Sequence, residues 1–281
     1  MAAAEDRQPF VVGRFQYQPD STRRAIRGTG GPTTPHSVRH PPGQGPSETV
    51  GLAPYESHEL PVYDARGIET TLEEEGVCLV PHAWAHVDYY NERQIQESYL
   101  PECCRLVRAH TGAQCVLASS YGVRCPSRNG EPLAEPRGLE SSAVMVPADN
   151  VHADHGLSTI EAGILKYEGL LGLPPGCRVQ HINVWRNIAD HPLTRNPLAC
   201  ADARTIPLDD LITYELRYLY QRFHPSCFLD AEGVQHSVDV PGVKPGGPVF
   251  SENYLARYSP SHRWLYWPRM TKDEALLIKQ W

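Results

Sequence analysis

The chain has 281 residues, of which 41% are hydrophobic and 21% are charged, so it can bury a sizeable core. Its formal net charge of -7, with no block of Lys and Arg, argues against nucleic acid or an anionic membrane surface as the main partner. No apolar run approaches bilayer length, and the start of the chain has no signal-peptide core, so we expect a cytoplasmic protein without membrane insertion. The eight cysteines lack zinc-type spacing, and we expect free thiols, mostly buried.

The N-terminal part of the chain predicts little regular structure. Residues 8–18 alternate well enough for one edge strand. Residues 19–56 are rich in Pro, Gly, Ser, Thr and Arg, and we expect a long loop that is ordered only where it lies on the body of the protein. We therefore divide the chain into a strand-and-loop region, 1–56, and a catalytic β-barrel domain, 57–281.

The next segment combines short strands with one long helix. Residues 60–67 predict a strand that closes in a turn, 71–76 a short helix with a Thr cap and a Gly stop, and 77–80 a buried strand. Residues 91–110 carry apolar side chains at helical spacing and end before Thr111-Gly112, which predicts an amphipathic helix.

Short strands dominate the rest of the chain. We expect them at 114–123, 143–152, 178–186, 198–206, 253–258, 262–267 and 275–280, with helices at 157–171 and 208–220. Many short strands with a few helices indicate a mainly β, α+β fold: a barrel or jelly roll with flanking helices packed outside.

The sharpest local pattern is His152-Ala153-Asp154. On a strand, residues two apart point to the same face, so the imidazole and the carboxylate can converge on one ion. They would supply two ligands of the 2-His-1-carboxylate set that holds Fe(II). The pattern alone is weak evidence, because a surface His and Asp in a turn also give it.

Two further clusters are candidates for a substrate pocket. In residues 180–186, His181, Asn183 and Trp185 share one strand face, which suits either a pocket or a solvated face. In residues 258–269, His262 shares a face with Trp264 and Tyr266, and the aromatic rings suit either a flat ligand or core packing. His262 itself is open to three roles: metal ligand, substrate contact or buried core histidine.

Seven stretches in this order resemble the AsaB-like hydroxylase/desaturase family of fungal secondary metabolism, which is related to the bacterial cephamycin component CmcJ. They are Val62–Gly67, Leu72–Gly76, Tyr99–Glu102 with Thr111–Ala113, Val151–Asp154, Ile182–Arg186, Pro197–Arg204, and His262–Trp267 followed by Glu274–Lys279. The resemblance implies a double-stranded β-helix that binds Fe(II) and 2-oxoglutarate. It places His152 and Asp154 in the metal site of an enzyme that oxidises a polyketide or terpenoid-type intermediate.

The family pattern also has a second metal His in a Pro-His-Thr-like motif, and an Arg near Arg-Glu-Ser that binds the co-substrate carboxylate. Neither motif occurs here, where the sequence reaches Lys279-Gln280-Trp281. Three explanations are open. His262 replaces the third ligand while Arg263 or Arg269 binds the carboxylate; the sequence is cut short; or the fold is reused, without cofactors, for a non-oxidative cyclisation such as a hetero-Diels–Alder reaction.

Our first expectation is an Fe(II)-dependent hydroxylase/desaturase with metal ligands His152, Asp154 and His262. Its partner would be a small-molecule pathway intermediate, and a homodimer is compatible with the sequence. A pericyclase and an inactive accessory protein are the alternatives. The candidate catalytic, substrate-binding and co-substrate residues are, in that order, Arg186 and His262; Asn183, Trp185, Trp264 and Tyr266; and Arg263 and Arg269.

Overall fold

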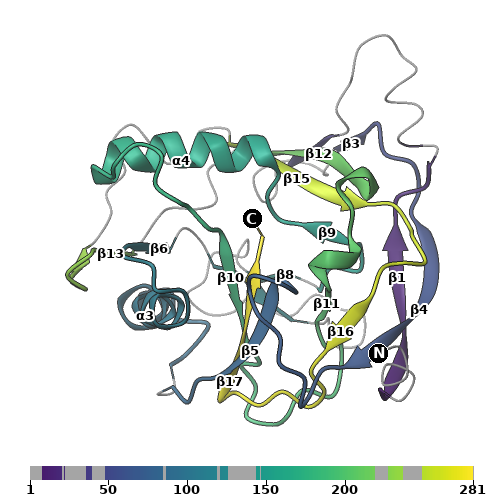
Figure 1. Ribbon diagram of the computed structural model, residues 1–281, viewed down its shortest axis with the longest axis horizontal. Helices are drawn as coiled ribbons and strands as arrows, with labels where there is room; N and C mark the ends of the chain where they lie inside the picture. The colour runs from purple at the N-terminus through teal and green to yellow at the C-terminus, as the bar shows by residue number, and fades with distance from the viewer. Residues whose placement is uncertain are drawn as a thin grey trace.

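The computed structural model describes most of the chain. The described residues are 8–20, 22, 36–39, 48–84, 87–118, 121–125, 144–145, 147–218, 227–236 and 249–280. Strands from several sheets surround the middle of the molecule, where the C-terminal end of the chain lies, and the two longer helices lie at its periphery (Figure 1). This arrangement confirms a mainly β, α+β fold with flanking helices.

One sheet has the order β1-β4-β16-β11. Its strands are β1 (Phe10–Tyr17), β4 (Glu56–Asp64), β16 (Trp264–Tyr266) and β11 (Ala199–Ala201). β1 pairs antiparallel with β4 along its whole length and lies at the edge of the sheet, as its alternation predicts. The inward side chains of these strands, including Phe15, Tyr17 and Val62, pack around Trp264.

A second sheet has the order β10-β17-β5, with β10 (Ile182–Trp185), β17 (Glu274–Lys279) and β5 (Val77–Pro81). Leu276 and Leu277 of β17 are both fully buried, but they belong to different core clusters on the two faces of the sheet. Burial on both faces explains why β17 is a continuous apolar run rather than an alternating one.

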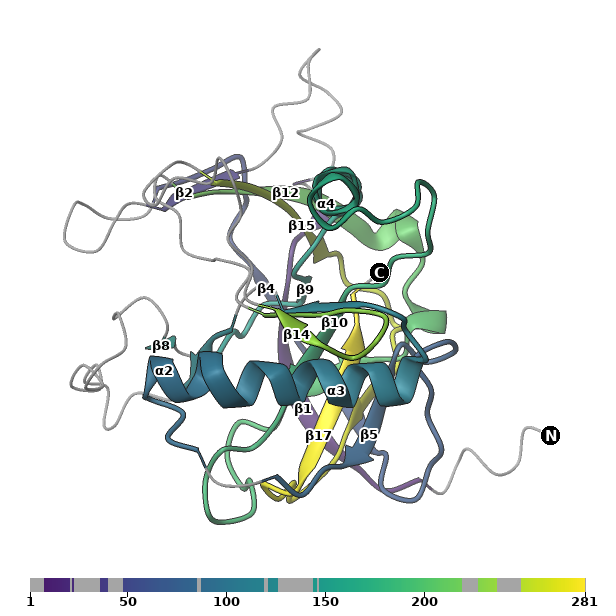
Figure 2. The same cartoon turned by 90° about the vertical axis from the view of Figure 1, so that its left-hand side faces the viewer.

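The predicted helix at 91–110 covers one face of this second sheet (Figure 2). It consists of α2 (Glu92–Gln94), the π-helical turn η2 (Ile95–Tyr99) and α3 (Leu100–Thr111). Asn91 caps its start, and Gly112 ends it in the left-handed conformation with φ 67°. The prediction of this helix is confirmed, but nothing in the residue pattern predicts the π-helical turn.

A third sheet, β3-β2-β12-β15-β9, corrects two predictions. Its strands are β3 (Glu48–Val50), β2 (His36–Arg39), β12 (Leu211–Tyr218), β15 (Val249–Ala256) and β9 (His152–Ala153). β12 occupies the span predicted as a helix, and β2 and β3 lie in the segment predicted as a loop. The division of the chain after residue 56 stays a prediction.

The remaining elements are short, apart from one helix. β14 (Gln235–His236), β13 (Cys227–Leu229) and β6 (Val116–Ala118) form one small sheet, and β7 (Val123–Arg124) pairs with β8 (Val144–Met145). The 3-10 turns are η4 (Ala203–Thr205) and η5 (Leu208–Asp210). Helix α4 (Leu157–Leu171) matches its prediction.

The predicted helix at 71–76 is a hydrogen-bonded turn instead. Thr71 Oγ1 accepts a hydrogen bond from the Glu74 amide, and Glu75 accepts one from the Thr71 amide. These contacts resemble a helix cap, but Gly76, with φ 76°, leads the chain directly into β5.

Two predictions from composition can be compared with the structure. All eight cysteines are free thiols, as expected, but only four of them are buried, and the other four are partly exposed. Within the described residues, no helix is both long enough and apolar enough to cross a lipid bilayer.

Candidate metal and substrate site

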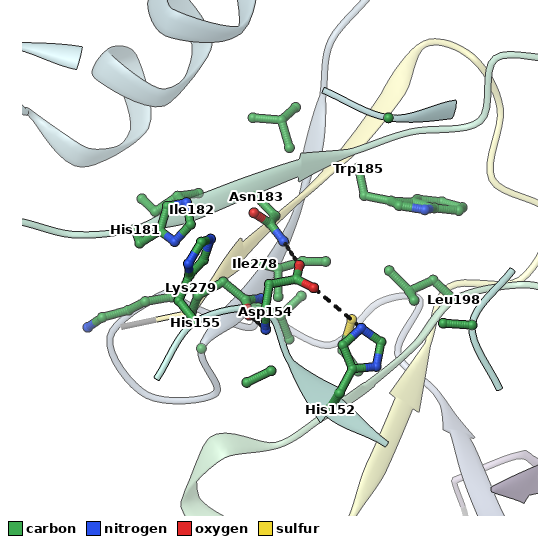
Figure 3. A pocket seen from close by; sticks show the side chains of 18 of the residues that line it. His152, Asp154, His155, His181, Ile182, Asn183, Trp185, Leu198, Ile278 and Lys279 are labelled. Atoms are coloured by element: carbon green, nitrogen blue, oxygen red, sulfur yellow. Dashed lines mark hydrogen bonds and ion pairs between the residues drawn. The ribbon is translucent and has the colours of Figure 1, made fainter. Parts of the chain in front are cut away.

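Strand β9 and the residue after it carry His152 and Asp154. β9 pairs with β15 through His152 and Leu255, which fixes the backbone at this position. The Asp154 backbone is held on both sides: its amide donates to Gln280 Oε1 at 2.9 Å, and its carbonyl accepts from Asn253 Nδ2 at 2.5 Å. Both side chains line the same cavity (Figure 3).

The imidazole of His152 has a defined orientation. Its Nδ1 lies 2.8 Å from the carbonyl oxygen of Asn150, and because a carbonyl only accepts, Nδ1 carries the proton of the neutral ring. Nε2 faces Asp154 Oδ1, 3.4 Å away. It donates to the carboxylate when the ring is protonated, and its lone pair is free for a metal ion when the ring is neutral. A carbonyl that accepts a hydrogen bond from the other ring nitrogen is typical of histidines that bind metals, because it fixes the tautomer and the orientation of the ring.

Asn183 of β10 holds the other oxygen of the Asp154 carboxylate. Its Nδ2 donates to Oδ2 at 2.6 Å (Figure 3). Burial alone would raise the pKa of Asp154, but the contacts with His152 and Asn183 hold it well below its usual value. Burial would lower the pKa of His152, but the Asp154 carboxylate raises it. The carboxylate is therefore ionised and ready to bind a cation.

His155 and His181 form a second imidazole pair beside Asp154. Their ring centroids are 3.9 Å apart and their planes are inclined by 62°. Burial, followed by the neighbouring His155, lowers the pKa of His181 to about 4, so its ring is neutral at neutral pH. The alternation of residues 180–186 predicts that His181 lies on the same strand face as Asn183. No sequence pattern predicts that His155 belongs to the site, apart from its position next to Asp154.

His152 and Asp154 fit a divalent cation. They offer one imidazole nitrogen and one carboxylate oxygen, the donor types that non-haem Fe(II) takes from proteins. Among the described residues, no group of three His, Cys, Asp or Glu side chains could hold a metal ion. The described side chains could thus offer His152 and Asp154, two of the three ligands that a facial triad needs.

The structure does not bring His262 to the pair. Trp264 Nε1 donates to Tyr17 Oη at 3.0 Å, Tyr17 lies 3.2 Å from His262 Nδ1, and His262 Nε2 lies 3.0 Å from Asp210. The tryptophan N–H can only donate, so the chain runs from Trp264 through Tyr17 and His262 to Asp210. Both ring nitrogens are engaged, and His262 is a buried structural histidine rather than a third metal ligand.

Arg263 and Arg269 also lie away from the pair. Arg263 donates to Gln8 Oε1 at 2.7 Å and is within 3.5 Å of Asp202, while its guanidinium stacks over Tyr63. Arg269 lies in a turn with φ 55°. Neither is among the described residues that line the cavity, so the geometry does not support a co-substrate clamp at either position.

The other predicted residues border one cavity of about 3050 Å³: Asn183, Trp185, Arg186, Trp264 and Tyr266. Trp264 is only 5% exposed and belongs mainly to the core, while Trp185 and Tyr266 are half-buried. A typical small-molecule site has roughly 300–1,000 Å³. The space therefore has room for more than one ligand-binding region.

Comparison with known proteins agrees with this fold. The family model described as "Oxidoreductase/YMDC permease-like domain" matches residues 27–281. The α-ketoglutarate-dependent dioxygenase phiK of a fungal species (strain ATCC 74256) is 25% identical over 222 residues, covering 78% of this chain and 68% of phiK. The hydroxylase/desaturase efuI of Hormonema carpetanum is 28% identical over 238 residues, covering 81% of this chain and 72% of efuI.

A solved structure shares the fold. The iron and α-ketoglutarate-dependent endoperoxidase NvfI superposes with a TM-score of 0.61 and 18% identity, covering 98% of this chain and 85% of NvfI. This likeness confirms the predicted double-stranded β-helix, and the relatives confirm the resemblance to AsaB-like hydroxylase/desaturases. The chain belongs to this oxidoreductase family.

Proposed function

We propose that this oxidoreductase is a cytoplasmic tailoring enzyme of fungal secondary-metabolite biosynthesis that hydroxylates or desaturates a polyketide or terpenoid-type intermediate with Fe(II) and 2-oxoglutarate. The convergence of His152 Nε2 and Asp154 Oδ1, 3.4 Å apart on the cavity wall, carries the proposal. The relatives phiK and efuI support the reaction type, and the free thiols are typical of a reducing compartment.

In this proposal, His152 and Asp154 hold the iron, which when bound supplies the activation of dioxygen. The Asn150 carbonyl keeps His152 in the tautomer whose Nε2 can bind a metal, and Asn183 keeps Asp154 ionised. Trp185 and Tyr266 orient an apolar substrate along the cavity, while Leu198 and Ile278 make part of its wall water-repellent.

The test is a turnover experiment with metal-free and Fe(II)-loaded protein, prepared without oxygen. Each form is incubated with pathway extract, with and without oxygen and 2-oxoglutarate, and the products are analysed by mass spectrometry. We expect a gain of one oxygen or a loss of two hydrogens only when iron, oxygen and 2-oxoglutarate are all present. His152→Ala should abolish iron binding, whereas the exposed His191→Ala should not.

The alternatives predict different results. An isomeric product formed by metal-free protein would identify a non-oxidative cyclase instead. Absence of turnover by folded, iron-loaded protein on any extract component would favour an accessory role. Either result would overturn the proposal.

A further inference from the structure

Arg186 follows β10 on the face of the sheet opposite Asn183. Ile182 and Val184 pack on this face against the cluster that contains Leu106 of α3. Arg186 continues the same alternation, and its guanidinium lies over the ring of Tyr99 at 5.4 Å. Its surroundings are therefore the π-helical turn and helix α3, not the His152–Asp154 pair.

The guanidinium of Arg186 is buried without a carboxylate of its own. The residue is 7% exposed, and within the described part of the chain no Asp or Glu forms an ion pair with it. Its Nη2 contacts His82 Nδ1, and His82 Nε2 lies 3.0 Å from Glu102 Oε1. Glu102 also accepts a hydrogen bond from Arg105 Nε at 2.7 Å. Its carboxylate is therefore shared between two cations, and it contacts Arg186 only indirectly, through the His82 imidazole.

Two nitrogens of the guanidinium, Nε and Nη1, are buried and lack a hydrogen bond of normal geometry with any described residue. The neutral Tyr89 hydroxyl is a nearby partner: burial raises its pKa, and the charge of Arg186 and a hydrogen bond with Arg186 oppose this effect. A hydroxyl does not neutralise the charge of the guanidinium. Leaving a buried cation and its N–H groups without partners is costly, and an anionic ligand would remove this cost.

Arg186 also lines the large cavity, and so do Tyr89 and Tyr99, which lie next to its guanidinium, and Ile95 and Leu100 of the same helical segment as Tyr99. Such a wall suits the body of an apolar or aromatic molecule, while the guanidinium suits a carboxylate. We infer that Arg186 binds the carboxylate of an organic acid in this helix-side part of the cavity. The inference does not depend on oxygenase activity, because it concerns binding on the other face of β10.

Binding to metal-free protein tests the inference. The probes are 2-naphthoate, its neutral counterpart 2-naphthamide, and 2-oxoglutarate, measured by isothermal titration calorimetry and by thermal shift. We expect a carboxylate to bind wild-type protein and to lose about 10- to 100-fold in affinity with Arg186→Gln. Arg186→Lys should retain part of the affinity. Arg93→Gln, which removes an exposed arginine in a surface ion pair with Glu97, should retain all of it.

The two acid probes distinguish the source of the carboxylate. Arg186-dependent binding of 2-naphthoate indicates an aromatic or apolar acid, and Arg186-dependent binding of 2-oxoglutarate indicates a small dicarboxylate; either supports the assignment. Absence of carboxylate binding to wild-type protein would overturn it. It would also be overturned if 2-naphthoate and 2-naphthamide bound equally well and 2-oxoglutarate showed no Arg186-dependent binding. Carboxylate affinity that is unchanged in folded Arg186→Gln protein would overturn it too. If Arg186→Gln does not fold, the binding of the carboxylate and amide probes to wild-type protein and to Arg186→Lys still tests the inference.

Discussion

Asn183 holds one oxygen of the Asp154 carboxylate and leaves the other facing His152. Removing the amide with Asn183→Ala would free the carboxylate to rotate and would weaken its preference for the ionised form. Loss of such an outer-shell partner typically lowers metal affinity by about 10- to 100-fold. We expect this loss in an oxygen-free Fe(II) titration followed by calorimetry. An unchanged affinity, with an unchanged melting temperature, would show that Asp154 needs no positioning by Asn183.

His262 should make the stability of the protein depend on pH. Its side chain is fully buried between Tyr17 and Asp210, and burial lowers its pKa below the usual 6.5 although Asp210 opposes this effect. The unfolded chain therefore binds this proton more readily, and stability is lost as the pH falls below about 6.5. Urea unfolding at several pH values should show a flatter pH dependence for His262→Gln. The exposed His191→Gln should keep the wild-type slope; equal slopes in all three proteins would contradict the role of His262.

At the scale of single residues, the sequence could identify candidate metal-ligand side chains but not all of the residues that contact them. The spacing of His152 and Asp154 was enough to place them on one face, and the alternation of β10 was enough to include Asn183. The pairing of His262 with Tyr17, a residue 245 positions away, has no local signal in the sequence. Arg186 follows the alternation of Ile182 and Val184, and the structure places it with them on the helix side of β10.

Helix α4 begins against β15 rather than at a capping side chain of its own. Gly156 donates its amide to the Glu252 carbonyl at 2.6 Å, and a Cβ at this position would overlap the Glu252 side chain. Glu252 Oε1 accepts from the Ser158 amide at 3.1 Å, and so it both caps the helix and complements its dipole. The segment after Asp154 is held to β15 through these contacts.

We expect Glu252→Ala to lower the free energy of unfolding by about 1 kcal/mol, the usual effect of losing a helix cap. Glu252→Gln keeps an accepting oxygen but loses the charge, and should cost only a few tenths of that amount. Urea denaturation followed by circular dichroism measures both. Equal losses in the two variants would show that the charge, rather than the hydrogen bond, stabilises α4.

The elements that the sequence predicted wrongly are those in which two periodicities compete. Residues 211–218 place apolar side chains at spacings that fit a helix as well as a strand. The β-branched and aromatic content of Ile212, Thr213 and Tyr214 favours the strand, and eight residue pairs with β15 stabilise it. β2 and β3 could not be predicted, because they are short strands within a Pro- and Gly-rich segment: β2 depends on pairing with β12, and β3 on pairing with β2.

At the scale of the whole molecule, the N-terminal strand belongs to the same core as the C-terminal strands. Phe15 of β1 stacks on Trp264 of β16, with ring centroids 4.3 Å apart, and both lie in one buried cluster with Tyr17 and Val62. The parallel pairing of β16 with β4 brings these distant parts of the sequence together. Unfolding of β1 should therefore not be separable from unfolding of the barrel.

Phe15→Ala tests this coupling. Phe15 is 8% exposed, so truncation leaves a cavity beside Trp264 and should cost about 3 kcal/mol. Because β1 shares the core, we expect the whole unfolding transition to shift to lower urea concentration, with fluorescence and circular dichroism changing together. Phe10→Ala on the same strand is the matched control, since Phe10 is 58% exposed and should shift the transition little. A separate early transition in Phe15→Ala, with the main transition left in place, would instead mean that β1 folds onto an independently stable barrel, as the division after residue 56 predicts.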